Sequence, residues 1–359
     1  MKDKFRAALL LGALLGLGLN APLQAATGKK PVHHVAKKGE ASAVKKPLAA
    51  NKPHAKLAAH AGHVKSASAM VPVKSAKAAD RHVQHLAAAT AHPPVRRPSL
   101  ADVDPSRLGL FSSSALVIDQ STGHAVLEKH ADTVTPIASI SKLMTAMVVL
   151  DAKLDLNEVI AIGEEDVDGL KGTRSRLPVG TTMTRETAML LALMSSENRA
   201  AHALGRHYPG GLTAFVAAMN RKAQVLGMGS TRFEEPTGLS SNNVSTAHDL
   251  ARMVAAAARY PDIRNFSTTA EAKVELNGRV QNFGTTNPLV RSDSWEIGVS
   301  KTGYISEAGR CLVMQARVAD KPVVIVLLDS AGKMTRVGDA IRIKRWMESA
   351  ALVTERRPV

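Results

Sequence analysis

Cysteine is almost missing from this chain of 359 residues. Its single cysteine, Cys311, has no partner in the chain, so an intrachain disulfide is excluded. No cysteine lies at the end of the N-terminal apolar segment, which excludes a lipoprotein anchor. Beyond that segment, no apolar run reaches the length of a membrane-spanning helix. These absences leave no intrachain disulfide, no lipid anchor and no candidate membrane span after the N-terminal segment.

The first 26 residues have the pattern of a secretory signal peptide. A net positive start (residues 1–6) precedes an uninterrupted apolar run from Ala7 to Leu19, and small residues follow up to Ala25 and Ala26. We expect cleavage after one of these two alanines. A retained membrane anchor is the alternative, but the apolar run is short for a permanent span. The sequence therefore predicts export, and the periplasm of a bacterium is the expected location.

Acidic residues are nearly absent from the segment that follows. Residues 27–100 contain 14 lysines and arginines but only two acids, and they hold 8 of the 13 histidines. Few large apolar side chains interrupt the Ala, Lys, His, Val and Pro, so we expect residues 27–105 to be a disordered basic linker. It is either a solvated spacer or an arm that binds an anionic envelope surface. Export argues against nucleic acid, and the histidines lack a metal-ligand spacing, so no metal or cofactor is expected.

From about residue 106 the pattern becomes that of a folded domain, expected to extend to 355. Short apolar runs at 114–119 and 124–128 surround a turn and predict a hairpin. Helices are expected at 139–150, 186–204, 212–226, 246–258 and 336–352, and strands at 297–304, 311–318 and 322–328. Strands at both sequence ends with helices between them predict an α/β fold in which one sheet joins the two ends and residues 152–245 form a helical lobe.

Two familiar catalytic patterns are missing: the chain has no Gly-x-Ser-x-Gly elbow and no His-Glu-x-x-His zinc motif. It has instead a serine three residues before a lysine, Ser139 and Lys142, at the start of an amphipathic helix. This spacing puts both side chains on one helix face, and a lysine that has lost its charge can take the serine's proton. The spacing alone is weak, because Ser42 and Lys45 share it in the basic linker.

Two further motifs follow in the order of a known group of enzymes. Ser196-Glu197-Asn198 lies in the helical middle, and Lys301-Thr302-Gly303 lies on an expected strand. Ser240-Ser241-Asn242 also fits the second motif, but Lys-Thr-Gly occurs once. The chain resembles the D-alanyl-D-alanine carboxypeptidase and endopeptidase group of serine peptidases over about residues 108–350, through stretches 136–147, 194–201, 301–304 and 308–314.

The resemblance implies a penicillin-binding-protein and β-lactamase-like transpeptidase fold, with an antiparallel sheet flanked by helices. It also implies roles for single residues. Ser139 would be the nucleophile and Ser196 a proton relay. Lys142 would be the base, with a pKa lowered by burial and by the second cation, Lys301. Gly303 would leave room for the substrate backbone beside its strand. Substrate would contact Asn198, Lys301, Thr302, Gly303 and Tyr304. The expected substrates are peptidoglycan peptides, with β-lactams as covalent inhibitors.

Several alternatives stay open for the reaction. Taken singly, Ser139 could be a plain helix cap and Lys301 a solvated charge. A carboxypeptidase that trims pentapeptide stems uses the same motifs as an endopeptidase that cuts D-alanyl-diaminopimelate cross-links. Glu197, where many carboxypeptidases have glycine, favours the endopeptidase branch. A β-lactamase would need a Glu-x-x-x-Asn segment, which is missing between Asn198 and Lys301. A non-catalytic wall-binding protein is the remaining alternative.

Overall fold

The structure, a computed structural model, describes residues 108–355. The signal peptide predicted at 1–26 and the basic linker predicted at 27–105 lie outside the described residues. Within the described part of the chain, none of the helices has both the length and the apolar character required to cross a membrane.

One five-stranded antiparallel sheet joins the two ends of the described chain. Its strand order is β2-β1-β11-β10-β9. The strands are β1 (Ser112–Asp119), β2 (Ala125–Lys129), β9 (Glu296–Ile305), β10 (Gly309–Val318) and β11 (Lys321–Ser330). β1 pairs with β11 from Ser112 opposite Ser330 to Asp119 opposite Val323. The predicted hairpin and the predicted meeting of both sequence ends in one sheet are confirmed.

The two faces of the sheet belong to two hydrophobic cores. Along β11, Val324 and Val326 face the core shared with the helical lobe, whereas Val323 and Ile325 face a second core. Successive side chains of a strand point to opposite faces, so burying both faces requires the continuous apolar run seen in β11.

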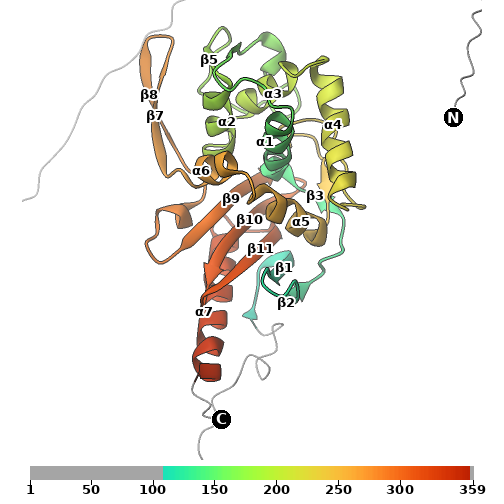
Figure 1. Cartoon of the computed structure of the whole chain (residues 1–359), viewed down its shortest axis with the longest axis vertical. Coiled ribbons are helices and arrows are strands. Elements are labelled where there is room, and N and C mark those ends of the chain that lie inside the picture. The colour runs from blue at the N-terminus through green and yellow to red at the C-terminus, as the bar shows by residue number, and fades with distance from the viewer. Residues whose placement is uncertain (1–107, 356–359) are drawn as a thin grey trace, which may run out of the picture. The chain divides into compact units, whose positions relative to one another are not determined.

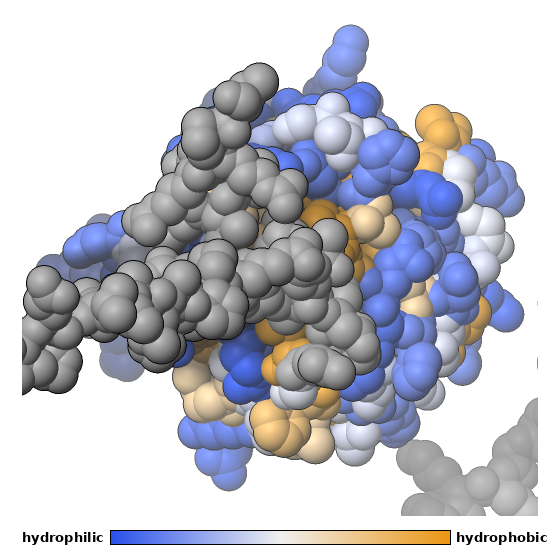
Figure 2. All heavy atoms as spheres, turned by 90° about the horizontal axis from the view of Figure 1, so that it is seen from below, coloured by the Kyte–Doolittle hydropathy of each residue, from blue (hydrophilic) through white to orange (hydrophobic). Residues whose placement is uncertain are grey.

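Helix α7 (Thr335–Glu355) closes the second core. It packs against β10, β11 and β1 and contributes Ile343 and Trp346 to that core. Where grey atoms do not cover it, the face seen from below in Figure 2 is mostly hydrophilic, with hydrophobic areas between the hydrophilic ones. The predicted final helix is thus confirmed, and it turns its apolar side chains toward the sheet.

The other face of the sheet carries the remaining helices (Figure 1). They are α1 (Ser141–Asp151), α2 (Arg185–Met194), α3 (Asn198–Arg206), α4 (Gly211–Val225), α5 (Ala247–Ala257) and α6 (Pro261–Thr268). As predicted, α4 ends before Gly227, which has a φ of 70°. Thr246 caps α5 by accepting from the Asp249 N–H, and the Asp249 carboxylate accepts from the Ser230 N–H.

Three small two-stranded sheets complete the fold and are not predicted from the sequence. They pair β3 (Thr135–Pro136) with β6 (Val244–Ser245), β4 (Val159–Ala161) with β5 (Thr182–Thr184), and β7 (Glu271–Leu276) with β8 (Arg279–Gly284). The strands of the first two are only two or three residues long, too short to show an alternating pattern.

Candidate active site

Ser139 lies in a single turn of 3-10 helix, Ala138–Ile140, that leads directly into α1. Ala138 and Ile140 are fully buried, whereas Ser139 remains partly exposed. The N-cap of α1 is Ile140, and no side chain caps this end of the helix. Ser139 is therefore not the helix cap that a serine at such a position often is.

Two glycines from distant segments hold the backbone of this turn. A Cβ on Gly303 of β9 would lie 2.9 Å from the Ile137 carbonyl oxygen and 3.2 Å from the Ser139 nitrogen. A Cβ on Gly238 would lie 1.8 Å from the Ala138 carbonyl oxygen. The missing side chain of Gly303 thus makes room for the nucleophile's own backbone, a reason that the sequence, which suggested room for a substrate, did not give.

Lys142 is fully buried and its amine touches three oxygens. Its Nζ lies 2.7 Å from Ser139 Oγ, 2.7 Å from Asn198 Oδ1 and 2.7 Å from the Thr237 carbonyl oxygen. Asn198 Oδ1 and the Thr237 carbonyl oxygen can only accept hydrogen bonds, so two N–H groups of the amine donate to them. The third position of the amine faces Ser139, where a neutral amine carries its lone pair.

Burial lowers the pKa of Lys142 to about 7, while the carboxylates of Glu235 and Glu197 act in the opposite direction. The sequence predicts that Lys301 helps to lower this pKa. Burial, then Lys142, then Arg336 hold the pKa of Lys301 well below its usual value, and the repulsion between the two amines acts on both of them. Lys142 is thus poised to lose its proton near neutral pH because it is buried.

The predicted helix over 186–204 is broken where the second motif lies. α2 ends at Met194 and α3 begins at Asn198. Between them Ser196 has a φ of 63°, a left-handed conformation that residues other than glycine seldom adopt. Such conformations are concentrated at functional sites, and here the break turns the Ser196 side chain toward β9.

Lys301 connects Ser196 to the sheet. It is 1% exposed, and its Nζ donates to Ser196 Oγ at 3.0 Å and to the Thr302 carbonyl oxygen at 2.8 Å. The Thr302 hydroxyl lies 2.6 Å from the hydroxyl of Thr286, a residue the sequence did not single out. Lys301 is therefore no solvated charge, the alternative considered for a strand lysine.

Asn198 joins the Lys142 amine to a nearby loop. Its Oδ1 accepts from Lys142, and its Nδ2 donates to Thr173 Oγ1 at 2.9 Å. The two ends of its amide are thus assigned by their partners. In this structure the side chain orients the Lys142 amine, in addition to the substrate contact that the resemblance implies.

A turn at 235–239 completes the surroundings of Lys142 and was missed in the sequence. The Glu235 carboxylate accepts from the backbone N–H groups of Thr237 and Gly238, each at 2.6 Å, which holds the Thr237 carbonyl toward Lys142. A Pro-Thr-Gly segment is typical of a turn, but nothing in it indicates a contact with Lys142. The competing Ser240-Ser241-Asn242 pattern follows on this turn, where Ser240 and Asn242 bind Glu234.

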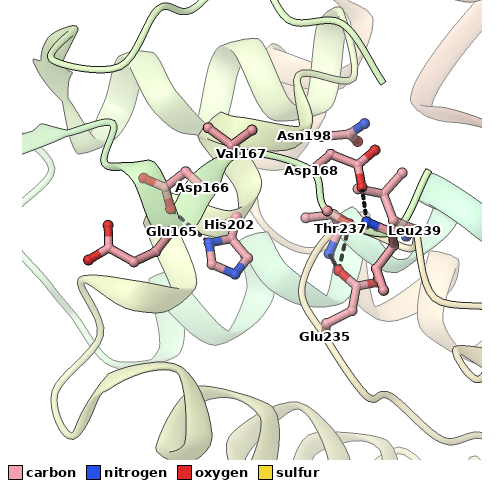
Figure 3. A pocket seen from close by; sticks show the side chains of 11 residues that line it. Glu165, Asp166, Val167, Asp168, Asn198, His202, Glu235, Thr237 and Leu239 are labelled. Atoms are coloured by element: carbon pink, nitrogen blue, oxygen red, sulfur yellow. Dashed lines mark hydrogen bonds and ion pairs between the residues drawn. The ribbon is translucent and has the colours of Figure 1, made fainter. Parts of the chain in front are cut away.

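A pocket of about 140 Å³ lies beside Asn198 and Thr237 (Figure 3). Four carboxylates line it: Glu165, Asp166, Asp168 and Glu235. His202 also lines the pocket. Its Nδ1 lies 2.7 Å from Asp166 Oδ1, so this histidine has a structural role in the pocket wall. No group of three or more histidine, cysteine or acidic side chains in residues 108–355 is placed to hold a metal ion.

The last two residues singled out in the sequence lie on neighbouring strands. Tyr304 follows the third motif, is 56% exposed, and stacks on Arg310, whose guanidinium carbon lies 4.4 Å from the ring centroid. Cys311 pairs with Gly303 across the strands and is fully buried, which raises the pKa of its thiol to about 11. A buried thiol with a raised pKa is unreactive, so Cys311 belongs to the core and not to the chemistry of the site.

The chain matches known proteins over this same region. The family model described as D-alanyl-D-alanine carboxypeptidase matches residues 102–332. The D-alanyl-D-alanine endopeptidase of Pseudomonas aeruginosa is 49% identical over 247 residues, which is 68% of this chain and 80% of the relative. The endopeptidase of Escherichia coli K12 is 47% identical over 68% of this chain and 79% of the relative.

Solved structures are similar as well. The Streptomyces K15 DD-transpeptidase is 27% identical with a TM-score of 0.62, over 66% of this chain and 97% of its own. Penicillin-binding protein D2 of Listeria monocytogenes, in an ampicillin-bound form, is 27% identical with a TM-score of 0.58, over 67% and 98%. The predicted fold class is confirmed. With its three motifs gathered around Ser139, the chain belongs to the D-alanyl-D-alanine carboxypeptidase family of serine peptidases, hydrolases that include the endopeptidases.

Proposed function

We propose that this chain is a DD-endopeptidase that hydrolyses D-alanyl-diaminopimelate cross-links of peptidoglycan through an acyl-enzyme on Ser139. The observation that carries the proposal is the amine of Lys142, which two fixed acceptors orient so that its third position faces Ser139 Oγ at 2.7 Å. Ser139 attacks the D-alanyl carbonyl, and its proton passes to neutral Lys142. The endopeptidase names of the two relatives at 47–49% identity support this branch.

The leaving group takes its proton on the β9 side of the site. Ser196 Oγ accepts from Lys301, so Ser196 can pass its hydroxyl proton to the departing amine while it takes a proton from the Lys301 ammonium, and the water that later hydrolyses the ester replaces that proton. The carboxylate next to the scissile bond binds near Lys301 and Thr302. Arg336, whose buried Nε and Nη1 have no partner within the described residues, adds a cation there. Backbone N–H groups of Ser139 and Tyr304 stabilise the oxyanion, by resemblance, and water then hydrolyses the ester.

The pH dependence of acylation follows from the pKa of Lys142. Only the neutral amine accepts the serine proton, so acylation by a labelled penicillin should rise with pH and level off above about pH 7. Stopped-flow or gel-based labelling between pH 5.5 and 9 measures this limb. A rate that stays constant over this range would contradict Lys142 as the base.

Digestion of purified muropeptides tests the proposed reaction. Cross-linked dimers should be converted to monomers by the protein and left intact by the Ser139→Ala variant. Release of D-alanine from pentapeptide monomers while dimers stay intact would instead establish the carboxypeptidase, the second candidate. That alternative is kept because the motifs bind the same carboxylate in both substrates.

The proposed location is the periplasm, reached through the signal peptide predicted at 1–26. β-Lactams are the proposed covalent inhibitors, since a relative of known structure binds ampicillin. The basic segment 27–105 is proposed as a spacer or as an arm that binds the anionic envelope, with no nucleic-acid partner.

A further inference from the structure

The loop between Asp168 and Leu177 has a defined form beside the active site. The Asp168 carboxylate accepts from the backbone N–H groups of Leu170 (2.8 Å), Lys171 (2.9 Å) and Thr173 (2.8 Å). Such a carboxylate-centred turn fixes the backbone on both sides of Lys171. The position of the Lys171 side chain therefore follows from the fold of the loop.

The Ser196-Glu197-Asn198 motif anchors this loop at two points. Asn198 donates to Thr173 Oγ1, and the Glu197 carboxylate binds Ser175 Oγ at 2.7 Å and Arg176 Nε at 2.8 Å. Glu197 is only 6% exposed. The loop is thus held against the same segment that carries Ser196.

At its outer side the loop reaches across to the sheet. Lys171 forms an ion pair with Glu307, which lies in the turn that follows β9. The second carboxylate oxygen of Glu307 accepts from Ser306 Oγ at 3.2 Å. The two charged side chains are 26% and 42% exposed. Exposed ion pairs contribute little stability, so this one opens at small cost.

Strand β9 gives the direction in which a substrate passes this pair. β9 is the edge strand of the sheet, so a peptide can lie along its free side. The leaving-group carboxylate lies at Lys301 and Thr302, and Gly303 packs beside Ser139. The acylating part of the substrate therefore continues from Tyr304 toward Glu307. The four residues from Tyr304 to Glu307 span at most roughly 13 Å if they are extended. The substrate residue that precedes the D-alanine, with its long side chain, can reach across this distance.

We propose that Lys171 and Glu307 form a subsite for the charged end of the diaminopimelate that precedes the D-alanine in the donor stem. That end carries an ammonium and a carboxylate on one carbon. The carboxylate of the ligand binds Lys171 in place of Glu307, and the ammonium of the ligand binds Glu307 in place of Lys171. This inference rests on the proposed function and names a recognition site for its substrate.

The binding of two peptides to an inactive variant measures the subsite separately from catalysis. In a Ser139→Ala background, calorimetry compares stem tetrapeptides that carry diaminopimelate or lysine, which lacks the second carboxylate. We expect the diaminopimelate peptide to bind about tenfold more tightly than the lysine peptide. Lys171→Met should abolish this preference by weakening the binding of the diaminopimelate peptide alone. Arg317→Met, which breaks the exposed Arg317–Glu296 pair elsewhere on β9 and β10, is the matched control and should keep the preference.

Two results would overturn the subsite: equal binding of both peptides before mutation, or equal weakening of both by Lys171→Met, which indicates a general effect on the loop. With Ser139 restored, the same preference should appear in the KM for dimers and be lost in Lys171→Met, whereas the Arg317→Met control should keep it. A protein that cuts no dimers would end the endopeptidase proposal, while the binding comparison would still decide the subsite.

Discussion

Replacing Lys142 with methionine should lower the rate constant of penicillin acylation at pH 8 by about a thousandfold, the middle of the range for loss of a general base. Methionine fills much of the same buried volume but accepts no proton from Ser139 Oγ, now 2.7 Å from the amine. Asn198 Oδ1 and the Thr237 carbonyl also lose a donor, at an expected cost to the free energy of unfolding of about 1–3 kcal/mol. The measurement is the time course of labelling with a fluorescent penicillin, alongside thermal unfolding.

Lys129→Met is the matched control, because Lys129 also donates to two backbone carbonyls, those of Leu110 and Ser112, away from the three motifs. It should be acylated at the original rate. A Lys142→Met protein that unfolds cooperatively and is acylated within tenfold of the original rate would assign the base to another group.

Gly238→Ala should both destabilise the protein and slow acylation. The added Cβ would lie 1.8 Å from the Ala138 carbonyl oxygen, and the φ of 82° is unfavourable for alanine. Backbone strain and overpacking together predict a loss of about 3 kcal/mol in the free energy of unfolding. Since the atom displaced belongs to the residue before Ser139, acylation should fall by at least about tenfold, equivalent to 1.4 kcal/mol in the barrier. Chemical denaturation and labelling kinetics measure the two effects.

Gly227→Ala separates the two causes of this loss. Gly227 has a φ of 70°, but its added Cβ would meet nothing within 4 Å. It should therefore cost only the backbone strain, about 1 kcal/mol, and leave acylation unchanged. Equal losses in the two variants would show that the close contact with Ala138 has no importance of its own.

The parts of the fold that could be predicted are those with strong local patterns. β9, β10 and β11 are long apolar runs separated by turns, and α4 has a glycine at its end. Ser139, Lys142, Ser196 and Lys301 could be singled out because their motifs have fixed spacings and a fixed order. The structure brings them into direct contact, with Lys142 on Ser139 and Lys301 on Ser196.

The parts that could not be predicted depend on contacts between distant segments. The break at Ser195–Glu197 lies in a sequence rich in helix-forming residues. Tertiary contacts of Ser196 and Glu197 hold it, together with local hydrogen bonds from Ser195 and Glu197 to the Leu191 carbonyl. Nothing in the local pattern around Thr237 indicates that its carbonyl accepts from an amine 95 residues earlier in the chain. The partner of Lys171 was hidden for the same reason.

The two glycines that hold the turn at Ser139 have a consequence for how activity arises during folding. Gly238 lies in a turn of the lobe and Gly303 in the edge strand, while β1 pairs with its neighbour β2 and with the last strand, β11. Contacts between segments so far apart in sequence form late, because a long loop must close before they are made. A chain interrupted before β9 would keep Ser139 and Lys142 but lack one side of their support. Catalytic competence should therefore appear in a single step, when the C-terminal strands dock. Partly folded chains should not be acylated at Ser139.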